Sequence, residues 1–395
     1  MNGRHIVIRG ILVAGLVLGA AGCRQSQEGG AGAASQADEA DVIRIGAIFA
    51  VTGPASFLGA PEEKTARVLV DRINEKGGVD GRRIQLILHD SGSKPENAIS
   101  LAKKLIDEDR VLAIIGPSTS GETMAIKNIC QEGKTILISC AAAEDIVNPV
   151  ASYVFKVPQK DSDAVRLIYR TMRKKGVSKI GVLASNDGYG IAGKTQLEKL
   201  APENGITIAI SEVYDKQATD LTDVLTKIKG KDVQAVVNWS IVPAQGLVAK
   251  NMKQIGLTVP LYQSMGFGNI EYVKAAGEAA NGTLFPCGRL LVAEQLPDDH
   301  PQKAVLMQYK KDYEGRYHEP VSTFGGHPYD ALLILTEAIR RAGSIDREKV
   351  RDAIENLQGL VATDGIFNFS PQDHSGLTID AFEMLTVKDG KFAIA

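Results

Sequence analysis

The segments Val111–Gly121, VLAIIGPSTSG, and Thr135–Ala143, TILISCAAA, decide the fold of this chain. Each begins with an apolar run rich in Ile and Leu and ends in a small turn without charged residues. Near-continuous apolar runs are typical of parallel strands that are buried on both faces. The turns that follow such strands lie where open α/β sheets bind ligands, and they present backbone N–H groups to an anion. The two segments therefore predict a carboxylate-binding edge on a parallel sheet.

The same alternation of strand, turn and helix continues along the chain. Further strands are predicted at 43–49 and 84–89, and helices at 61–76 and from Pro95 onward. The pattern restarts at Lys179 with strands at 179–184, 206–210, 235–237 and 260–263 and helices at 191–200, 221–228 and 247–255. Two helices, 302–317 and 329–342, and a β-rich end from Ile366 follow. We therefore expect an α/β fold with two doubly wound lobes that share one cleft.

Composition narrows the class of protein. A chain of 395 residues is too long for one ordinary core, so two domains are expected. A net charge of −2 with 23% charged residues gives no reason to expect a nucleic-acid partner. The six histidines and the three cysteines after Cys23 show no metal-ligand spacing, so we expect neither a metal nor a cofactor.

The N-terminus predicts export. Arg4 and Arg9 precede the apolar run 11–21, which is too short to span a bilayer and leads through small residues to Cys23. Residues 1–22 are therefore interpreted as a signal peptide that resembles a bacterial lipoprotein signal, with Cys23 as the lipidated residue. Ala20 stands where such signals usually have Leu, so an ordinary secretory signal is the alternative. Residues 23–41 are rich in Gly, Ala, Ser and Gln and predict a flexible tether.

Several segments are similar to the type I periplasmic binding proteins for leucine, isoleucine and valine. They are 43–59 (IRIGAIFAVTGPASFLG), 73–89 (INEKGGVDGRRIQLILH), 114–120 (IIGPSTS), 136–143, 155–163 (FKVPQKDSD) and 186–190 (NDGYG). The resemblance implies two lobes joined by three crossovers, near Lys160, near Arg289 and within 367–380. Lobe 1 would then comprise 42–160 with about 290–366, and lobe 2 would comprise 161–289 with about 367–395.

The resemblance also implies a binding site. Ser120, through its hydroxyl and N–H, would hold the ligand carboxylate together with the backbone of Ala141 and the N–H of Ala143. Tyr189 would close over the ligand from the second lobe. A side-chain pocket would be formed by Leu58, Ser118, Thr119 and Phe324. The complete set of predicted ligand-binding residues is Ser120, Ala141, Ala142, Ala143, Tyr189, Thr119, Ser118, Leu58, Phe324, Trp239 and Met265.

Two departures from the family pattern concern the ligand. Ala143 stands where the family usually has Thr, and Met265 stands where it usually has an acid that pairs with the ligand ammonium. An ammonium without its carboxylate loses charge-assisted hydrogen bonds of roughly 1.5–3 kcal/mol each. One hypothesis is therefore a small organic acid with an apolar body and no α-amino group. The other is an amino acid whose ammonium pairs with Asp161 or Glu144.

Two motifs invite enzymatic interpretations. Residues 188–193 form a G-x-G-x-x-G sequence with Glu212 roughly 20 residues later, as in a dinucleotide site. Three polar residues separate the preceding strand from its first glycine, which favours a ligand-capping loop instead. Ser120 has neither a G-x-S-x-G elbow nor a histidine in a recognisable partner segment, so it is not predicted to be a nucleophile. His327 is interpreted as a polar residue at a helix start. We therefore expect a binding protein and not an enzyme.

The predicted function is that of an extracytoplasmic solute-binding lipoprotein of an ABC importer. It would be a monomer, anchored to the membrane by its N-terminal lipid, that passes a small ligand to an ABC permease. The chain lacks a G-x-x-x-x-G-K-[ST] loop, so partner ATPase subunits would supply the energy. A ligand-sensing receptor of the same fold without a transport role is the alternative, because a fold does not determine a function. An exported hydrolase would require a catalytic constellation that the sequence does not show.

Overall fold

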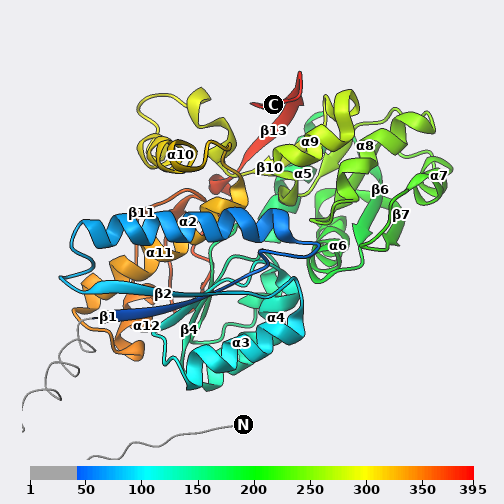
Figure 1. The fold of residues 1–395 in the computed structure, drawn as a ribbon. Helices are drawn as coiled ribbons and strands as arrows, with labels where there is room; N and C mark the ends of the chain where they lie inside the picture. The colour runs from blue at the N-terminus through cyan, green and yellow to red at the C-terminus, as the bar shows by residue number, and fades with distance from the viewer. Residues whose placement is uncertain (1–41) are drawn as a thin grey trace, which may run out of the picture. The chain divides into compact units, whose positions relative to one another are not determined.

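The computed structural model describes residues 42–395 (Figure 1). The predicted signal peptide 1–22, the lipidated Cys23 and the tether 23–41 lie outside the described residues. Within residues 42–395, no helix combines the length and the apolar character needed to cross a bilayer.

The first lobe is built on a five-stranded parallel sheet in the order β2-β1-β3-β4-β5. Its strands are β1 (Val42–Phe49), β2 (Arg83–Asp90), β3 (Ala113–Ile115), β4 (Ile136–Ser139) and β5 (Val154–Lys156). Its helices are α2 (Ser56–Glu75), α3 (Pro95–Asp107), α4 (Ser120–Glu132), α11 (Thr323–Ala342) and α12 (Arg347–Glu355). In Figure 1 helices α2 and α11 lie on one side of this sheet and α3 and α4 on the other. The point at which the strand order reverses lies between β1 and β3, and ligands bind at such a switch point in open α/β sheets.

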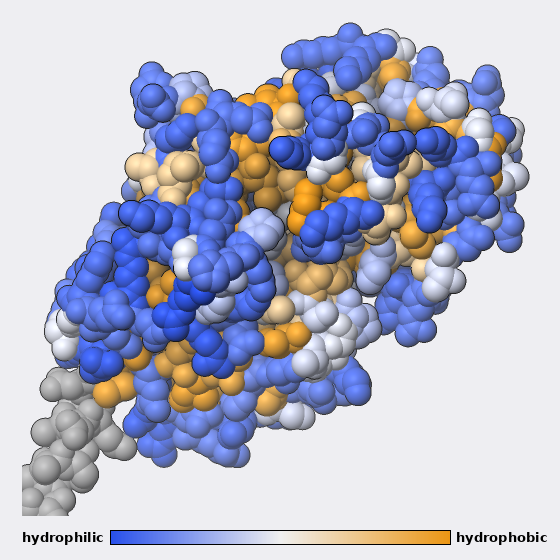
Figure 2. Space-filling model, turned by 45° about the horizontal axis from the view of Figure 1, so that its top comes forward, coloured by the Kyte–Doolittle hydropathy of each residue, from blue (hydrophilic) through white to orange (hydrophobic). Residues whose placement is uncertain are grey.

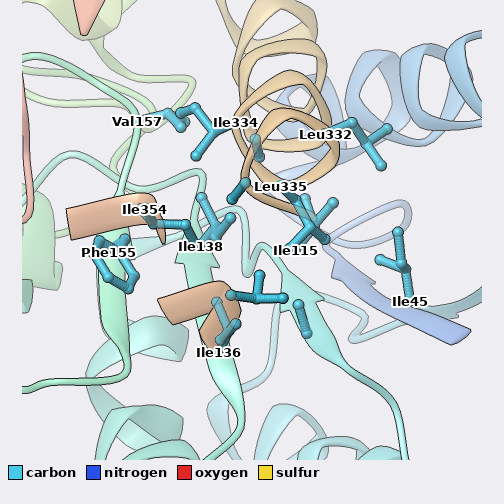
Figure 3. Close-up of a cluster of buried hydrophobic side chains, with 14 of the residues drawn as sticks. Ile45, Ile115, Ile136, Ile138, Phe155, Val157, Leu332, Ile334, Leu335 and Ile354 are labelled. Carbon is cyan, nitrogen blue, oxygen red and sulfur yellow. The ribbon is translucent and has the colours of Figure 1, made fainter. Parts of the chain in front are cut away.

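Alternate residues of these strands enter separate cores on the two faces of the sheet. Ile45 and Ile115 pack with α11, whereas Ile48 and Ile114 pack on the opposite face with α3 and α4. Figure 3 shows the α11 side, where Leu332 and its neighbours lie against side chains of the strands. This burial on both faces explains why the strands are almost entirely apolar.

The second lobe repeats the design. Its sheet has the order β14-β13-β10-β9-β8-β6-β7, in which β13 pairs antiparallel with both β10 and β14. Its strands are β6 (Lys179–Ser185), β7 (Thr207–Tyr214), β8 (Ala235–Trp239), β9 (Leu261–Gln263), β10 (Leu284–Cys287), β13 (Glu383–Lys388) and β14 (Lys391–Ile394). Its helices are α5 (Asp161–Lys174), α6 (Gly188–Leu200), α7 (Thr222–Lys229), α8 (Gln245–Gln254) and α9 (Ile270–Ala276). The two doubly wound α/β lobes predicted from the sequence are confirmed.

Shorter elements complete the described chain. They are α10 (Lys303–Tyr317), the hairpin β11 (Leu360–Val361) and β12 (Ile366–Phe367), and the 3-10 helices η1 (Glu144–Ile146), η2 (Pro202–Asn204), η3 (Met265–Phe267), η4 (Gly277–Ala280), η5 (Arg289–Gln295) and η6 (Ile379–Ala381). On the face drawn in Figure 2, hydrophilic residues predominate and apolar residues show in patches.

The last passage between the lobes lies between Leu377 and Phe382, at the end of the expected region 367–380. Phe367, Phe369 and Leu377 belong to the core of the first lobe, and Phe382 belongs to the core of the second. Aromatic packing keeps this segment in the first lobe, because the Phe369 ring lies 5.4 Å from that of Phe367 and 5.9 Å from that of Phe155. The chain enters the second sheet only with β13.

Helix α2 begins at Ser56, five residues before the predicted start at Pro61. A proline inside a helix leaves the carbonyl four residues earlier without its usual N–H donor. That carbonyl belongs to Phe57, and it accepts a hydrogen bond of 3.5 Å from Nδ2 of Asn269 in the second lobe. The Phe57 ring also meets Tyr272 of the second lobe, with ring centroids 5.4 Å apart. The proline therefore leaves an acceptor that the second lobe uses.

Candidate functional site

A cavity of about 40 Å³ lies between the lobes. The first lobe supplies loops that follow β3 and β4 and the start of α11, and the second lobe supplies the starts of α6 and η3. Predicted site residues that line it are Leu58, Ser118, Ser120, Ala141, Ala142, Tyr189, Met265 and Phe324. The structure thus brings together residues that are more than 200 positions apart in the chain.

Ser120 is the hydroxyl donor available for a carboxylate. Its Oγ accepts a hydrogen bond of 3.2 Å from the N–H of Ala143, which leaves its own proton to be donated. The N–H of Ala141 is occupied by Oγ of Ser139 at 3.0 Å. The N–H of Ala142 has no acceptor among residues 42–395. Ser120 and Ala142 therefore form the donor pair of the first lobe.

The buried ammonium of Lys156 lies behind this loop. Its Nζ donates to the carbonyl oxygens of Ala142, Pro158 and Gln159 at 3.0, 2.7 and 2.9 Å. Burial lowers the pKa of Lys156 to about 8, and the neighbouring Asp161 opposes that change. A cation at this position stabilises an anion held by the loop, because charges interact strongly where water is excluded.

A buried acid also lies next to the cavity, in contact with the lining residue Ser118. Ser118 Oγ accepts from the N–H of Ala50 at 2.9 Å and donates to a carboxylate oxygen of Glu62. Burial, opposed by the bond from Ser118 and reinforced by the charge of Glu122, raises the pKa of Glu62 well above its ordinary value. This shift favours the protonated acid, which does not repel a bound carboxylate.

Tyr189 enters the cavity from the second lobe. It lies in the first turn of α6, which is capped by Asp187 through hydrogen bonds from the N–H groups of Tyr189 and Gly190 at 2.9 and 3.2 Å. Its ring is 98% buried and lies 5.9 Å from the ring of Trp239. Met265 and Gly266 of η3 lie beside it in the cavity lining. The second lobe thus offers an apolar wall together with the Tyr189 hydroxyl, which has no hydrogen-bond partner among residues 42–395.

Three predicted site residues do not line the cavity. Thr119 caps α4 by accepting from the N–H of Glu122 at 3.3 Å, and it borders a separate hollow between the lobes. Ala143 contributes its N–H to Ser120. Trp239 is fully buried behind Tyr189, with its indole packed against Gly193.

The G-x-G-x-x-G sequence is explained by packing. A Cβ atom at Gly193 would overlap the indole of Trp239, and one at Gly190 would overlap the backbone of Ser185. A Cβ atom at Gly188 would lie 3.1 Å from the backbone nitrogen of Gly121 in the other lobe. These glycines therefore permit close approaches within and between the lobes.

Neither acid proposed to pair with a ligand ammonium lines the cavity. Asp161 is fully buried at the start of α5 beside Lys156, and both of its carboxylate oxygens lack a hydrogen-bond partner in the described chain. Glu144 accepts from the N–H of Ser162 at 3.2 Å. The acid in the cavity lining is Asp364, which the sequence did not indicate.

Asp364 contacts two further polar residues, His327 and Gln159, which the sequence analysis did not place in the site. Its Oδ2 lies 2.7 Å from Nδ1 of His327, and its backbone oxygen accepts from Nε2 of Gln159 at 2.8 Å. All three side chains line the cavity. The only sequence signal was the position of His327 three residues after Phe324, and nothing local placed Asp364 near either.

Among residues 42–395, no group of three or more His, Cys, Asp or Glu side chains is arranged to hold a metal ion. The cysteines of this part of the chain, Cys130, Cys140 and Cys287, are free and buried. Burial raises the pKa of each thiol, that of Cys130 to about 12.

Comparison with known proteins shows the family of this chain. Residues 42–391 match the model of the family described as periplasmic binding protein. A leucine-, isoleucine-, valine-, threonine- and alanine-binding protein of Pseudomonas aeruginosa is 28% identical over 326 residues, which cover 82% of this chain and 85% of that protein. A Leu/Ile/Val-binding protein of Rhizobium johnstonii is 24% identical over 89% of this chain and 94% of its own length.

Solved structures show the same fold. An extracellular ligand-binding receptor from Rhodopseudomonas palustris HaA2 superposes with a TM-score of 0.84 at 27% identity, covering 89% of this chain and 99% of that one. The substrate-binding protein LivJ from Streptococcus pneumoniae, solved with isoleucine, has a TM-score of 0.77 at 24% identity, with 89% and 97% covered. With the family model matched over nearly all of the described residues, this chain belongs to the periplasmic binding protein family and has its type I fold.

Proposed function

We propose that this chain is the extracytoplasmic solute-binding protein of an ABC importer and that it captures a small carboxylate between its lobes. The observation that carries the proposal is the cavity between the lobes, lined by the donors Ser120 and Ala142 from one lobe and by the side chains of Tyr189 and Met265 from the other. A ligand that contacts both lobes favours the closed arrangement, because only differential contact shifts a conformational equilibrium. Closure would then present both lobes to a permease.

The proposed ligand is a branched-chain or hydrophobic amino acid or a related apolar carboxylate. Leu58, Phe324, Ile241 and Met265 supply apolar surface to the cavity, and Ser120 supplies the donor for the carboxylate. The curated relatives are named for binding leucine, isoleucine and valine, which supports this class of ligand.

We further propose that Cys23 carries a lipid and that the chain acts as a monomer at the membrane surface. Recovery of an ABC permease by cross-linking in intact cells is the expected result. Recovery of a signalling protein in its place would support the sensing alternative.

Calorimetric titration of the purified protein tests the binding proposal. The ligands are leucine, phenylalanine, benzoate and 4-methylpentanoate. We expect saturable binding of one ligand per chain for at least one of them, and a loss of about tenfold in affinity for Ser120→Ala, since a hydrogen bond to a carboxylate is removed. The control is Ser100→Ala, because Ser100 is exposed and donates only to Glu96 O at 3.2 Å. Absence of binding by all four ligands would contradict the proposal.

A further inference from the structure

The cavity is lined by a pair of polar residues that do not belong to the proposed carboxylate-binding pair, Ser120 and Ala142. His327, in the first turns of α11, and Asp364, between β11 and β12, are joined by the 2.7 Å contact of Nδ1 with Oδ2. Their residues are 93% and 96% buried, and both line the cavity. They lie beside Phe324, whose ring centroid is 6.2 Å from that of His327. The pair therefore lies next to the pocket assigned to the body of the ligand.

Structural anchoring does not account for this pair. The segment that carries Asp364 is already held by Asp330, whose carboxylate accepts from the N–H groups of Thr363 and Asp364, both at 2.7 Å, and from the Thr363 hydroxyl at 2.9 Å. The backbone oxygen of Asp364 is held in addition by Gln159 at 2.8 Å. His327 is therefore not needed to fix the position of the turn.

Each member of the pair keeps one polar atom for the cavity. Nε2 of His327 and Oδ1 of Asp364 have no hydrogen-bond partner among residues 42–395. Neither belongs to the fully enclosed polar atoms that lack a partner in this part of the chain, and both residues line the cavity. The two atoms are therefore candidates for contact with a ligand.

The hydrogen bond within the pair determines what these atoms recognise. Where the carboxylate of Asp364 accepts a hydrogen bond from the Nδ1–H of His327, a neutral imidazole carries a lone pair on Nε2. Oδ1 and Nε2 are then both acceptors, and two neighbouring acceptors match an N–H or O–H group. An apolar ligand body would leave them unpaired, which is costly inside a protein.

We propose that His327 and Asp364 form a second polar subsite, which binds a hydrogen-bond donor on the ligand, either an ammonium or a hydroxyl group. This inference rests on the proposed carboxylate-binding function and narrows its ligand to carboxylates that carry such a donor. The acidic partner of an ammonium is then Asp364, and not the residue at position 265.

Two matched pairs of probes test the subsite by calorimetry. Leucine and 4-methylpentanoate differ by the amino group, and 4-hydroxyphenylacetate and phenylacetate differ by the hydroxyl group. The variants are His327→Phe and Asp364→Asn. The matched control is His374→Phe, because His374 is also a buried histidine with an acidic partner, Glu355 at 3.2 Å, but does not line the cavity.

We expect the donor-bearing member of at least one pair to bind native protein about tenfold or more tightly than its partner. This ratio should fall below about twofold in both variants and persist in His374→Phe. The leucine pair reports an ammonium ligand and the phenylacetate pair a hydroxyl ligand. If His327→Phe does not fold, the affinity ratio measured with Asp364→Asn tests the subsite alone.

Equal affinities within both pairs, or a ratio that survives in the variants, would overturn the subsite while leaving the carboxylate-binding function intact. Failure of all four probes to bind native protein would overturn the subsite, and failure of phenylalanine and benzoate as well would overturn the carboxylate-binding function with it.

Discussion

Replacement of Lys156 by methionine is the most direct test of how the cavity loop is held. The Lys156 ammonium is fully buried and donates three hydrogen bonds of 2.7–3.0 Å, one to the cavity loop at Ala142 and two to the segment that leads into the second lobe. Methionine preserves most of the volume but none of the donors. Lys156→Met therefore leaves three carbonyl groups without this donor and Asp161 without its neighbouring cation.

The magnitude follows from the state of the partners. Leaving a buried hydrogen-bonding group without its partner costs about 1–3 kcal/mol, and Lys156→Met removes the donor of three carbonyl groups. This is a large part of the roughly 5–15 kcal/mol by which folded domains are stable. Burial raises the pKa of Asp161 to about 8 and the charge of Lys156 opposes this rise, so without Lys156 the carboxyl is held in its protonated form and leaves no uncompensated charge.

Urea unfolding followed by circular dichroism measures the effect. The matched control is Lys160→Met, because Lys160 pairs with Asp373 at 2.8 Å with side chains that are 24% and 37% exposed. Such a partly exposed pair contributes about 0–1 kcal/mol. If Lys156→Met lost no more free energy of unfolding than Lys160→Met, the role assigned to the buried ammonium would be refuted.

Three further outcomes are expected. The raised pKa of Glu62 means that its stabilising contribution is complete below its ordinary value of 4.5 and is lost as the pH rises through the folded-state pKa. Glu62→Gln should therefore match native protein in thermal melts at pH 4 and exceed it at pH 8, and a constant difference between these pH values would contradict the assignment. Gly193→Val should lower stability by about 1–3 kcal/mol and shift the emission of Trp239, because the new side chain meets the indole; unchanged melting and emission would exclude that contact. The three free cysteines of the described chain should resist alkylation at pH 8 until denaturant is added, and rapid labelling of folded protein would show that they are accessible.

Much of the fold could be predicted because its determinants are local. The strands β1 and β2 lie within one residue of their predicted limits, since an apolar run bounded by turn residues is a short-range signal. The start of α2 was misplaced because Pro61 is typical of a first helical turn, whereas here the free carbonyl of Phe57 finds a donor in the other lobe. That compensation is a contact between segments 212 positions apart, and no local pattern reveals it.

The candidate site likewise has residues whose position could be predicted from the local sequence and residues whose position could not. The turns with Ser120 and Ala142 were visible in the sequence because small residues after apolar strands are a local feature. Trp239 was expected at the ligand on the strength of its size and chemistry, but its position behind Tyr189 depends on the packing of α6 against β8. Whether a buried ring lines the cavity or lies behind another residue depends on how the core packs as a whole.

The sequence by itself determined two α/β layers and the family to which the chain belongs, and it predicted an anion-binding edge on the first layer, because periodicity and turn chemistry act over a few residues. Only the tertiary structure decided which acid faces the ligand space. Gln159 and Asp364 are 205 positions apart and Asp364 and His327 are 37 apart, and they meet because three segments converge between the lobes. Such a meeting depends on how complete layers pack, and no single segment of the chain encodes it.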